Sequence, residues 1–383
     1  MTEASLHSIL ELASHLVATR SCAGIDAPDG VLALMEAWLE EHDLAPRLLS
    51  DGDGRPVAVW VEIASDRPGP LLCLDACIDT APAGDPDLWR EPPFSAAVQG
   101  HRLLGRGAAD SKAGVAILAH VAATLAASGL PRGTLHVLFD ADEHTGRFGG
   151  ARAYLEATSR LPDAVSLGYP GNDCFVVGSR GFLRARVGFP GKAAHSGETG
   201  RSGINAVTKA AAFALRVAET PPPDSHDPAF PFGAKATVTH IEGGQGFSIV
   251  PDHAACHVDI RLTRAFDAAQ ARRWLEESAH AVDPRCRIDV VDHWPAYVVE
   301  PTDRLVRSFS AAAEAAFARP IPSEVSGMSN IGNLLAARGV STICAPGVSF
   351  ANIHATDEWA DIGSMMPVYA MYCDAVRRFL ASD

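Results

Sequence analysis

Pro70-Leu71-Leu72-Cys73-Leu74-Asp75-Ala76-Cys77-Ile78-Asp79 is the stretch that decides the fold of this chain. Its apolar run is short, follows a proline and ends at an aspartate, which is typical of a buried β-strand. Thr134–Phe139 and Ala164–Gly168 repeat this pattern. Helical patterns occupy the intervals between the runs, over Lys112–Ala127 and Phe148–Ala157. Such alternation predicts an α/β domain with a mostly parallel sheet and helices on both faces.

Polar side chains follow each of these runs directly. Cys77 and Asp79 come after the first run, Asp142 to His144 after the second, and Tyr169 after the third. Parallel sheets place their working residues at the carboxyl ends of the strands. These residues are therefore candidates for a functional site.

The pattern changes between about residues 182 and 291, where the order becomes strand, helix, strand, strand, helix, strand. That order matches a ferredoxin-like α+β domain. After Asp292 the alternation of helix and strand patterns returns. The sequence therefore predicts a discontinuous catalytic domain over residues 1–180 and 292–383, with an inserted domain over residues 181–291.

Composition and charge limit the function classes. The chain has 383 residues, enough for two or three domains with a full core, and a formal net charge of −14. A surface of that sign repels nucleic acid and anionic lipid, so neither nucleic acid nor a membrane is expected as a partner. The eight cysteines include no C-x-x-C pair and are expected to be small buried residues. The N-terminal segment has the pattern of an amphipathic helix, not a signal peptide, and a cytoplasmic enzyme is expected.

Five motifs in series carry a family resemblance. They are Cys77-Ile78-Asp79-Thr80-Ala81-Pro82, Gly105-Arg106-Gly107-Ala108-Ala109-Asp110-Ser111-Lys112-Ala113-Gly114, Asp142-Glu143-His144-Thr145-Gly146, Gly191-Lys192-Ala193-Ala194-His195-Ser196-Gly197 and Ile353-His354-Ala355-Thr356-Asp357-Glu358. In order and spacing, over nearly the whole chain, they resemble the M20 metallopeptidase and amidohydrolase family, which includes aminoacylases and desuccinylases. The resemblance implies a catalytic α/β domain with an inserted dimerisation or lid domain.

The resemblance also implies roles for two groups. Glu143 stands at the position of the general base, which takes a proton from a metal-activated water and passes it to the leaving nitrogen. His195 stands at the position of a histidine that reaches the active site of a neighbouring subunit and stabilises the developing oxyanion. A homodimer is therefore expected.

The metal positions depart from the family pattern. In the family, an aspartate bridges two metal ions, and Asp110 occupies that position; its alternative is a plain helix N-cap. One ligand set becomes Asp110, His144 and His354, which still suits zinc, although His144 is alternatively a surface histidine. The other set becomes Cys77, Asp110 and Tyr169 and has lost two of its usual ligands. One zinc ion per subunit is expected, and iron or another divalent metal is an alternative.

Three side chains at the altered set have their own interpretations. Cys77 is either a zinc-binding thiolate or a small residue that fills space. Asp79 normally accepts the ring N–H of a metal-binding histidine, and because cysteine has no ring N–H, Asp79 is expected to lose that role. Tyr169 is expected to fill the site or to donate a hydrogen bond.

The substrate side is implied by further matches. Arg261, in Asp259-Ile260-Arg261, matches an arginine that grips a substrate carboxylate, and its alternative is a solvated charge. Other positions matching the family's substrate side are Ser248, Asn330 and Gly347. The expected function is a metal-dependent hydrolase that cleaves an amide or other acyl bond of a small carboxylate-bearing substrate. The alternatives are a non-hydrolytic step, such as proton transfer, cyclisation or acyl transfer, and a non-catalytic binding protein.

Overall fold

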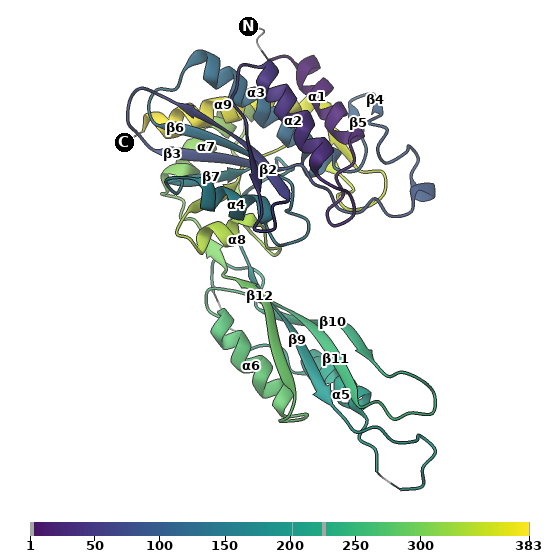
Figure 1. Cartoon of the computed structure of the whole chain (residues 1–383). Coiled ribbons are helices and arrows are strands. Elements are labelled where there is room, and N and C mark those ends of the chain that lie inside the picture. Colours follow the sequence, from purple (N-terminus) through teal and green to yellow (C-terminus); the bar gives the residue numbers. More distant parts are fainter. Residues whose placement is uncertain (1–3, 201, 224–226, 383) are drawn as a thin grey trace. The chain divides into compact units, whose positions relative to one another are not determined.

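The computed structural model describes residues 4–200, 202–223 and 227–382. The chain divides into two compact units, labelled by element in Figure 1. Unit 1 is formed by the chain up to Val177, by Val299–Glu324 and by the chain from Arg338. Unit 2 is formed by Gly178–Val298 and Val325–Ala337.

Unit 1 is built on a central sheet whose strand order is β1-β2-β6-β3-β7-β15-β8. The pairs β6–β3, β3–β7 and β7–β15 are parallel, whereas the strands outside them pair antiparallel. The predicted α/β class with a mostly parallel central sheet is confirmed. The strands are β1 (Arg47–Ser50), β2 (Pro56–Ala64), β3 (Leu71–Cys77), β6 (Thr134–Asp140), β7 (Ala164–Leu167), β8 (Phe175–Ser179) and β15 (Ser341–Cys344).

Helices cover both faces of this sheet. Cys73 of β3 is paired with His136 of β6, so their side chains share a face of the sheet. On this face, the His136 ring forms a hydrogen bond of 2.7 Å with the Tyr154 hydroxyl of α4. Ala76 is three residues after Cys73, so its side chain faces the other way, and helices α3 and α9 also contact β3. The helices of unit 1 are α1 (Leu6–Ala18), α2 (Asp29–Glu41), α3 (Ala113–Ser128), α4 (Gly149–Ala157), α7 (Arg304–Phe317) and α9 (Met365–Ala381).

The core explains why these segments take these forms. All seven residues of β3 are buried, as expected for a strand covered on both faces. Helix α3 is apolar on nearly every side because it lies between the sheet and helices α1 and α9. The segment Ala108–Ser128 is long and apolar enough to cross a membrane, but 67% of its most apolar window is buried inside the protein. That burial is the property of a core helix.

A second, smaller sheet in unit 1 has the order β16-β17-β5-β4 and is antiparallel. Its pairing of β17 with β5 joins segments far apart in the sequence: Trp359 lies opposite Leu104. The residues just before β17 are thereby held beside the residues just after β5. The strands are β4 (Val98–Gln99), β5 (Arg102–Leu104), β16 (Phe350–Ala351) and β17 (Trp359–Asp361).

Unit 2 has the predicted ferredoxin-like order of elements, with the antiparallel strand order β10-β11-β9-β12. Alternate residues of β9, including Val187 and Phe189, pack with Phe213 of α5 and Leu275 of α6 in its core. Its elements are β9 (Gly181–Pro190), α5 (Ala206–Glu219), β10 (Lys235–Gly243), β11 (His253–Leu262), α6 (Ala268–His280), β12 (Arg287–Trp294), β13 (Tyr297–Val298) and α8 (Ile331–Ala336), and β14 (Ser323–Ser326) runs into it from unit 1.

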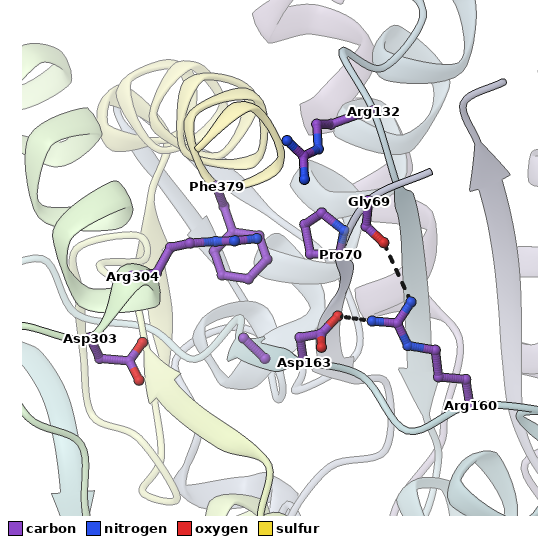
Figure 2. Close-up of a pocket in the computed structure, with 9 residues that line it drawn as sticks. Gly69, Pro70, Arg132, Arg160, Asp163, Asp303, Arg304 and Phe379 are labelled. Carbon is purple, nitrogen blue, oxygen red and sulfur yellow. Dashed lines mark hydrogen bonds and ion pairs between the residues drawn. The ribbon is translucent and has the colours of Figure 1, made fainter. Parts of the chain in front are cut away.

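An open cavity of about 390 Å³ lies where β3 and β7 begin (Figure 2). Arg160 donates to Asp163 and to the Gly69 carbonyl in this cavity, and the Arg304 guanidinium lies 4.3 Å from the centre of the Phe379 ring. These contacts are an ion pair, a hydrogen bond and a cation–π contact. The residues lining the cavity include no histidine, thiol or hydroxyl side chain that could act as a nucleophile or general base. The candidate residues that follow the apolar runs lie instead at the opposite, carboxyl ends of the strands.

Candidate active site

Three neighbouring strands bring the candidate residues to one edge of the sheet. Cys77 ends β3 and is paired with Asp140, which ends β6. Because the strands are parallel, the segments that follow them leave at the same edge. Glu143 and His144 follow β6, and Tyr169 follows β7. This arrangement accounts for the residues that lie directly after apolar runs in the sequence.

The other two candidate residues of unit 1, Asp110 and His354, reach this edge through the small sheet. The Gly105 amide donates to the Glu358 carbonyl at 3.0 Å, which continues the β5–β17 pairing toward the site. The Glu358 carboxylate then accepts the backbone N–H groups of Ala109 and Asp110 at 3.1 and 3.2 Å. Arg106 pairs with Glu358, and both side chains are at most 2% exposed. This buried pair holds the Asp110 turn against the segment that carries His354.

Asp110, His144 and His354 converge on one point. The Asp110 Oδ2 atom lies 3.1 Å from His354 Nε2 and 3.4 Å from His144 Nε2. One ligand-type atom from each residue lies within 4.8 Å of the others. His354 has a φ of 59°, in the left-handed region that residues other than glycine seldom adopt, and such conformations cluster at functional sites.

Asp79 contacts both the backbone and the ring of His144. The Asp79 Oδ2 atom accepts the backbone N–H of His144 at 2.8 Å and lies 3.4 Å from its ring Nδ1. Because position 77 is cysteine, Asp79 was expected to have no histidine partner. The structure differs from this expectation. The partner is His144, which reaches Asp79 from the segment after β6.

The pKa of His144 depends on the charged side chains around its ring. Burial alone would lower the pKa of His144, but the negative carboxylates of Asp110 and Asp79, each 3.4 Å from a ring nitrogen, outweigh it and raise this pKa to about 11. For Asp110, burial acts to raise the pKa, yet the nearby His144 ring and the hydrogen bonds from His354 and Ser111 hold it below its usual range. The carboxylate is thus ionised and ready to bind a cation.

The residues of this cluster fit a divalent metal ion. One carboxylate and two imidazoles form a three-ligand set that zinc accepts with a further position open. Both ring nitrogens of His144 are buried and, among the described residues, lack a hydrogen bond of good geometry. A buried polar atom without such a bond is costly, and a metal ligand relieves that cost. Cys77, Glu143 and His144 form a second grouping of ligand-type atoms, which shares His144 with the first.

Glu143 lies beside the cluster in a mostly buried position. Its Oε1 atom accepts the Tyr169 hydroxyl at 3.0 Å, and its Oε2 atom lies 3.4 Å from His144 Nδ1. Burial raises the pKa of Glu143 to about 7; the charge of His144 opposes this rise, whereas those of Asp110 and Asp79 add to it. A carboxyl group with a pKa near neutrality can both take and return a proton.

Cys77 and Tyr169 remain protonated in this environment. Burial is the main reason that the pKa of the Cys77 thiol is raised well above its usual value, and the charges of Asp110 and Glu143 raise it further. Burial likewise raises the pKa of the Tyr169 phenol, again with a contribution from Glu143. The Cys77 sulfur lies 3.5 Å from the Ser111 hydroxyl.

Gly347 also lies at this edge, in unit 1. Its amide donates to the Gly171 carbonyl at 2.7 Å. A Cβ atom at position 347 would lie 2.0 Å from the Tyr169 carbonyl oxygen, so this close approach requires glycine. Gly347 thereby shapes the loop that carries Tyr169.

Four predicted residues lie in unit 2. His195 is exposed and forms an isolated bridge with Ile249, which places it beside Ser248. Arg261 donates through Nε to Asp259 at 2.8 Å and through Nη1 to the Ser329 hydroxyl at 3.1 Å. Asn330 directly precedes α8, where its side-chain oxygen accepts the Gly332 amide at 2.8 Å, so its direct role in the structure is that of the helix N-cap.

Two further side chains, Glu358 and Ser111, support the site and are not among the residues expected from the sequence. Glu358 links the Asp110 turn to the His354 segment, and Ser111 donates its hydroxyl to Asp110 Oδ1 at 2.7 Å. The sequence contains two signs of this link: an acidic residue, Glu358, shortly after His354, and an arginine, Arg106, in the Gly-Arg-Gly motif. Charged residues in an apolar fold are buried together when they pair, so this combination could have suggested the Arg106–Glu358 pair.

This fold and this site define a metal-dependent enzyme of the amidohydrolase and peptidase class. The sequence profile of peptidase family M20/M25/M40 matches residues 73–378, which is most of the chain. The protein belongs to this family.

Similar sequences include desuccinylases. A succinyl-diaminopimelate desuccinylase from Gluconacetobacter diazotrophicus is 26% identical over 97% of this chain and 97% of its own. Succinyl-diaminopimelate desuccinylase 2 from Shewanella loihica is 30% identical over 61% of this chain and 64% of its own. The chain is therefore a desuccinylase-like or peptidase-like member of the family.

Solved structures share the fold at low sequence identity. An M20 family metallo-carboxypeptidase from Sulfolobus solfataricus superposes with a TM-score of 0.78 and 17% identity over 97% of this chain and 98% of its own. A dinuclear metal-binding M20 peptidase from Bacillus subtilis superposes with a TM-score of 0.72 and 17% identity over 99% of each chain. Membership of this family implies use of a divalent metal.

Proposed function

We propose that this enzyme hydrolyses an amide, or another acyl bond, of a small carboxylate-bearing substrate, with one divalent metal ion held by Asp110, His144 and His354. The observation that carries the proposal is the convergence of one carboxylate and two imidazoles beside a buried Glu143. Zinc is the proposed ion because this ligand set suits it. A metal bound there supplies positive charge that polarises a carbonyl oxygen and acidifies water.

Glu143 is the proposed proton carrier. Its pKa of about 7 allows it to accept a proton from the attacking water and to return it to the leaving nitrogen. The Tyr169 hydroxyl donates to Oε1 and so leaves Oε2 as the oxygen available for this exchange. Asp79 orients His144 through both its backbone N–H and its ring.

His195 and Arg261 are the proposed substrate contacts in unit 2. The His195 side chain is exposed and able to donate to a developing negative charge, which is what an oxyanion requires. Arg261 already pairs with Asp259, so a substrate carboxylate would share its guanidinium. The proposal includes a homodimer in which unit 2 mediates the association. Location in the cytoplasm, without a nucleic-acid or membrane partner, stays a prediction.

The deciding experiment combines metal analysis with a substrate panel. We expect purified protein to retain one zinc ion per subunit and to hydrolyse members of a panel of N-succinyl amino acids, N-acetyl amino acids and dipeptides. The relatives' desuccinylase activity is the reason for including succinyl amides. Removing the metal with a chelator should abolish hydrolysis, and adding zinc back should restore it. Hydrolysis that continues at full rate without metal would refute the proposal, and so would a proton-exchange activity that survives chelation in place of hydrolysis.

A further inference from the structure

The two oxygens of the Asp110 carboxylate face different chemistry. Oδ2 faces the two imidazoles, at 3.1 Å from His354 and 3.4 Å from His144. Oδ1 accepts the Ser111 hydroxyl at 2.7 Å, and the Cys77 thiol lies 3.5 Å from the Ser111 oxygen and 3.9 Å from Oδ1, so its one proton can reach either oxygen. One oxygen therefore faces the two imidazoles of the proposed metal site, and the other faces hydrogen-bond donors.

The neighbouring carboxylate, that of Glu143, also accepts a hydrogen bond from a hydroxyl group on one of its oxygens. Glu143 Oε1 accepts the Tyr169 hydroxyl at 3.0 Å. Cys77, Ser111 and Tyr169 thus present protons to the carboxylate oxygens on their side of the site. A metal ion needs lone pairs from its ligands, whereas these three side chains are proton donors that occupy carboxylate lone pairs on their side of the site.

We propose that Cys77, Ser111 and Tyr169 act together in place of a second metal ion and hold the carboxylates of Asp110 and Glu143 by hydrogen bonds. A buried carboxylate requires either a cation or several hydrogen-bond donors, and this chain supplies the donors from three different segments. The site is thereby limited to one metal ion. Tyr169 is a positioning residue for Glu143, and Ser111 is one for Asp110. The inference rests on the proposed single-metal hydrolase.

Restoring ligands should restore a second metal position. The double variant Cys77→His, Tyr169→Glu replaces two donors with two metal ligands, and we expect it to bind two zinc ions per subunit where the wild type binds one. The single variants are matched controls, because each adds only one ligand, and each should still bind one ion. Metal content after dialysis, measured by elemental analysis, is the readout. A folded double variant that holds one ion would overturn the inference.

Cobalt titration of the wild-type protein tests the same point without depending on a folded double variant. A cobalt–thiolate bond gives an intense near-ultraviolet charge-transfer band, so Cys77 as a ligand would be visible. We expect binding to saturate at one equivalent with no thiolate band, and the spectrum of Cys77→Ser to be the same. Saturation at two equivalents, or a thiolate band that disappears in Cys77→Ser, would overturn the inference even if hydrolysis proceeds. One bound ion without hydrolysis would refute only the proposed function.

The positioning role of Tyr169 has its own readout. Tyr169→Phe keeps the ring and removes the donor to Glu143. We expect kcat to fall roughly ten- to a hundredfold, the value of one hydrogen bond to a charged group, with KM and metal content unchanged. An unchanged kcat, or a loss that appears only in KM or in thermal stability, would contradict this role.

Discussion

Asp79 and His144 form a pair between the segments that follow two neighbouring parallel strands, β3 and β6. Oδ2 of Asp79 accepts the backbone N–H of His144 at 2.8 Å and lies 3.4 Å from the ring Nδ1, while the ring Nε2 faces Asp110. A carboxylate on one ring nitrogen sets the tautomer that leaves the other nitrogen free to bind a metal. The histidine missing at position 77 is thus replaced, as a partner of Asp79, by the histidine at position 144.

Asp79→Asn should weaken metal binding. Asparagine keeps the size of the side chain but removes the charge that orients His144, and the expected loss of zinc affinity is roughly ten- to a hundredfold. Competition with a chromophoric chelator measures this loss. Asp163→Asn is a suitable control, because Asp163 is a carboxylate just before β7, at the opposite edge of the sheet. Equal zinc affinity in the wild type and in Asp79→Asn would contradict the pairing.

Glu143→Gln should separate catalysis from metal binding. Glutamine preserves shape and can still contact Tyr169, but it cannot carry the proton. We expect kcat to fall by roughly two to four orders of magnitude while zinc content stays the same. His144→Ala provides the contrast, because it should lower zinc affinity at least as much as Asp79→Asn does. Normal turnover in Glu143→Gln would assign the proton transfer to another group.

Metal binding should release a proton and strengthen as the pH rises. Against the effect of burial, Asp110 and Asp79 raise the pKa of His144 to about 11, so the metal-free ring carries two protons at neutral pH. A metal ion must displace the proton on Nε2, and lowering the proton concentration therefore favours binding. We expect zinc affinity to rise about tenfold per pH unit between about pH 7 and pH 9. Calorimetry in buffers of different ionisation enthalpy counts the protons released, and an affinity independent of pH would disprove the expected charge state.

Asp75→Asn should stabilise the metal-free protein at alkaline pH. Burial, together with the charges of Glu143 and Asp79, raises the pKa of Asp75 to about 8. Because this pKa lies above the unfolded value of about 4, the folded state holds the proton more tightly, and stability falls as the pH rises from about 4 to about 8. The uncharged variant lacks this loss, so its advantage should be small at about pH 4, grow through this range and reach at least about 1 kcal/mol at pH 8.

Urea unfolding in the presence of a chelator, at several pH values, gives the comparison for Asp75→Asn. The two proteins should have similar free energies of unfolding at acid pH and diverge as the pH rises. Parallel curves across the whole range would show that Asp75 is not a buried acid with a raised pKa.

The local chain pattern determined the fold class. The apolar runs at Leu71, Thr134 and Ala164 became β3, β6 and β7, because a run of only four to seven residues between polar or turn residues is too short for a helix and is typical of a strand buried on both faces. Side-chain chemistry at the ends of these runs also indicated the region of the site, since parallel strands deliver their ends to one edge. Spacing and residue type were sufficient for both conclusions.

Only the tertiary structure decided the pairing of side chains. Asp79 with His144, Ser111 and Cys77 with one oxygen of Asp110, and Glu358 with the Asp110 turn depend on strand order and register. The sequence by itself determined which chemical groups the site contains, because those are residue identities at the ends of recognisable elements. It did not determine which oxygen meets which donor. A hydrogen bond or metal contact depends on distances within about 0.5 Å, and packing of segments far apart in the chain sets those distances.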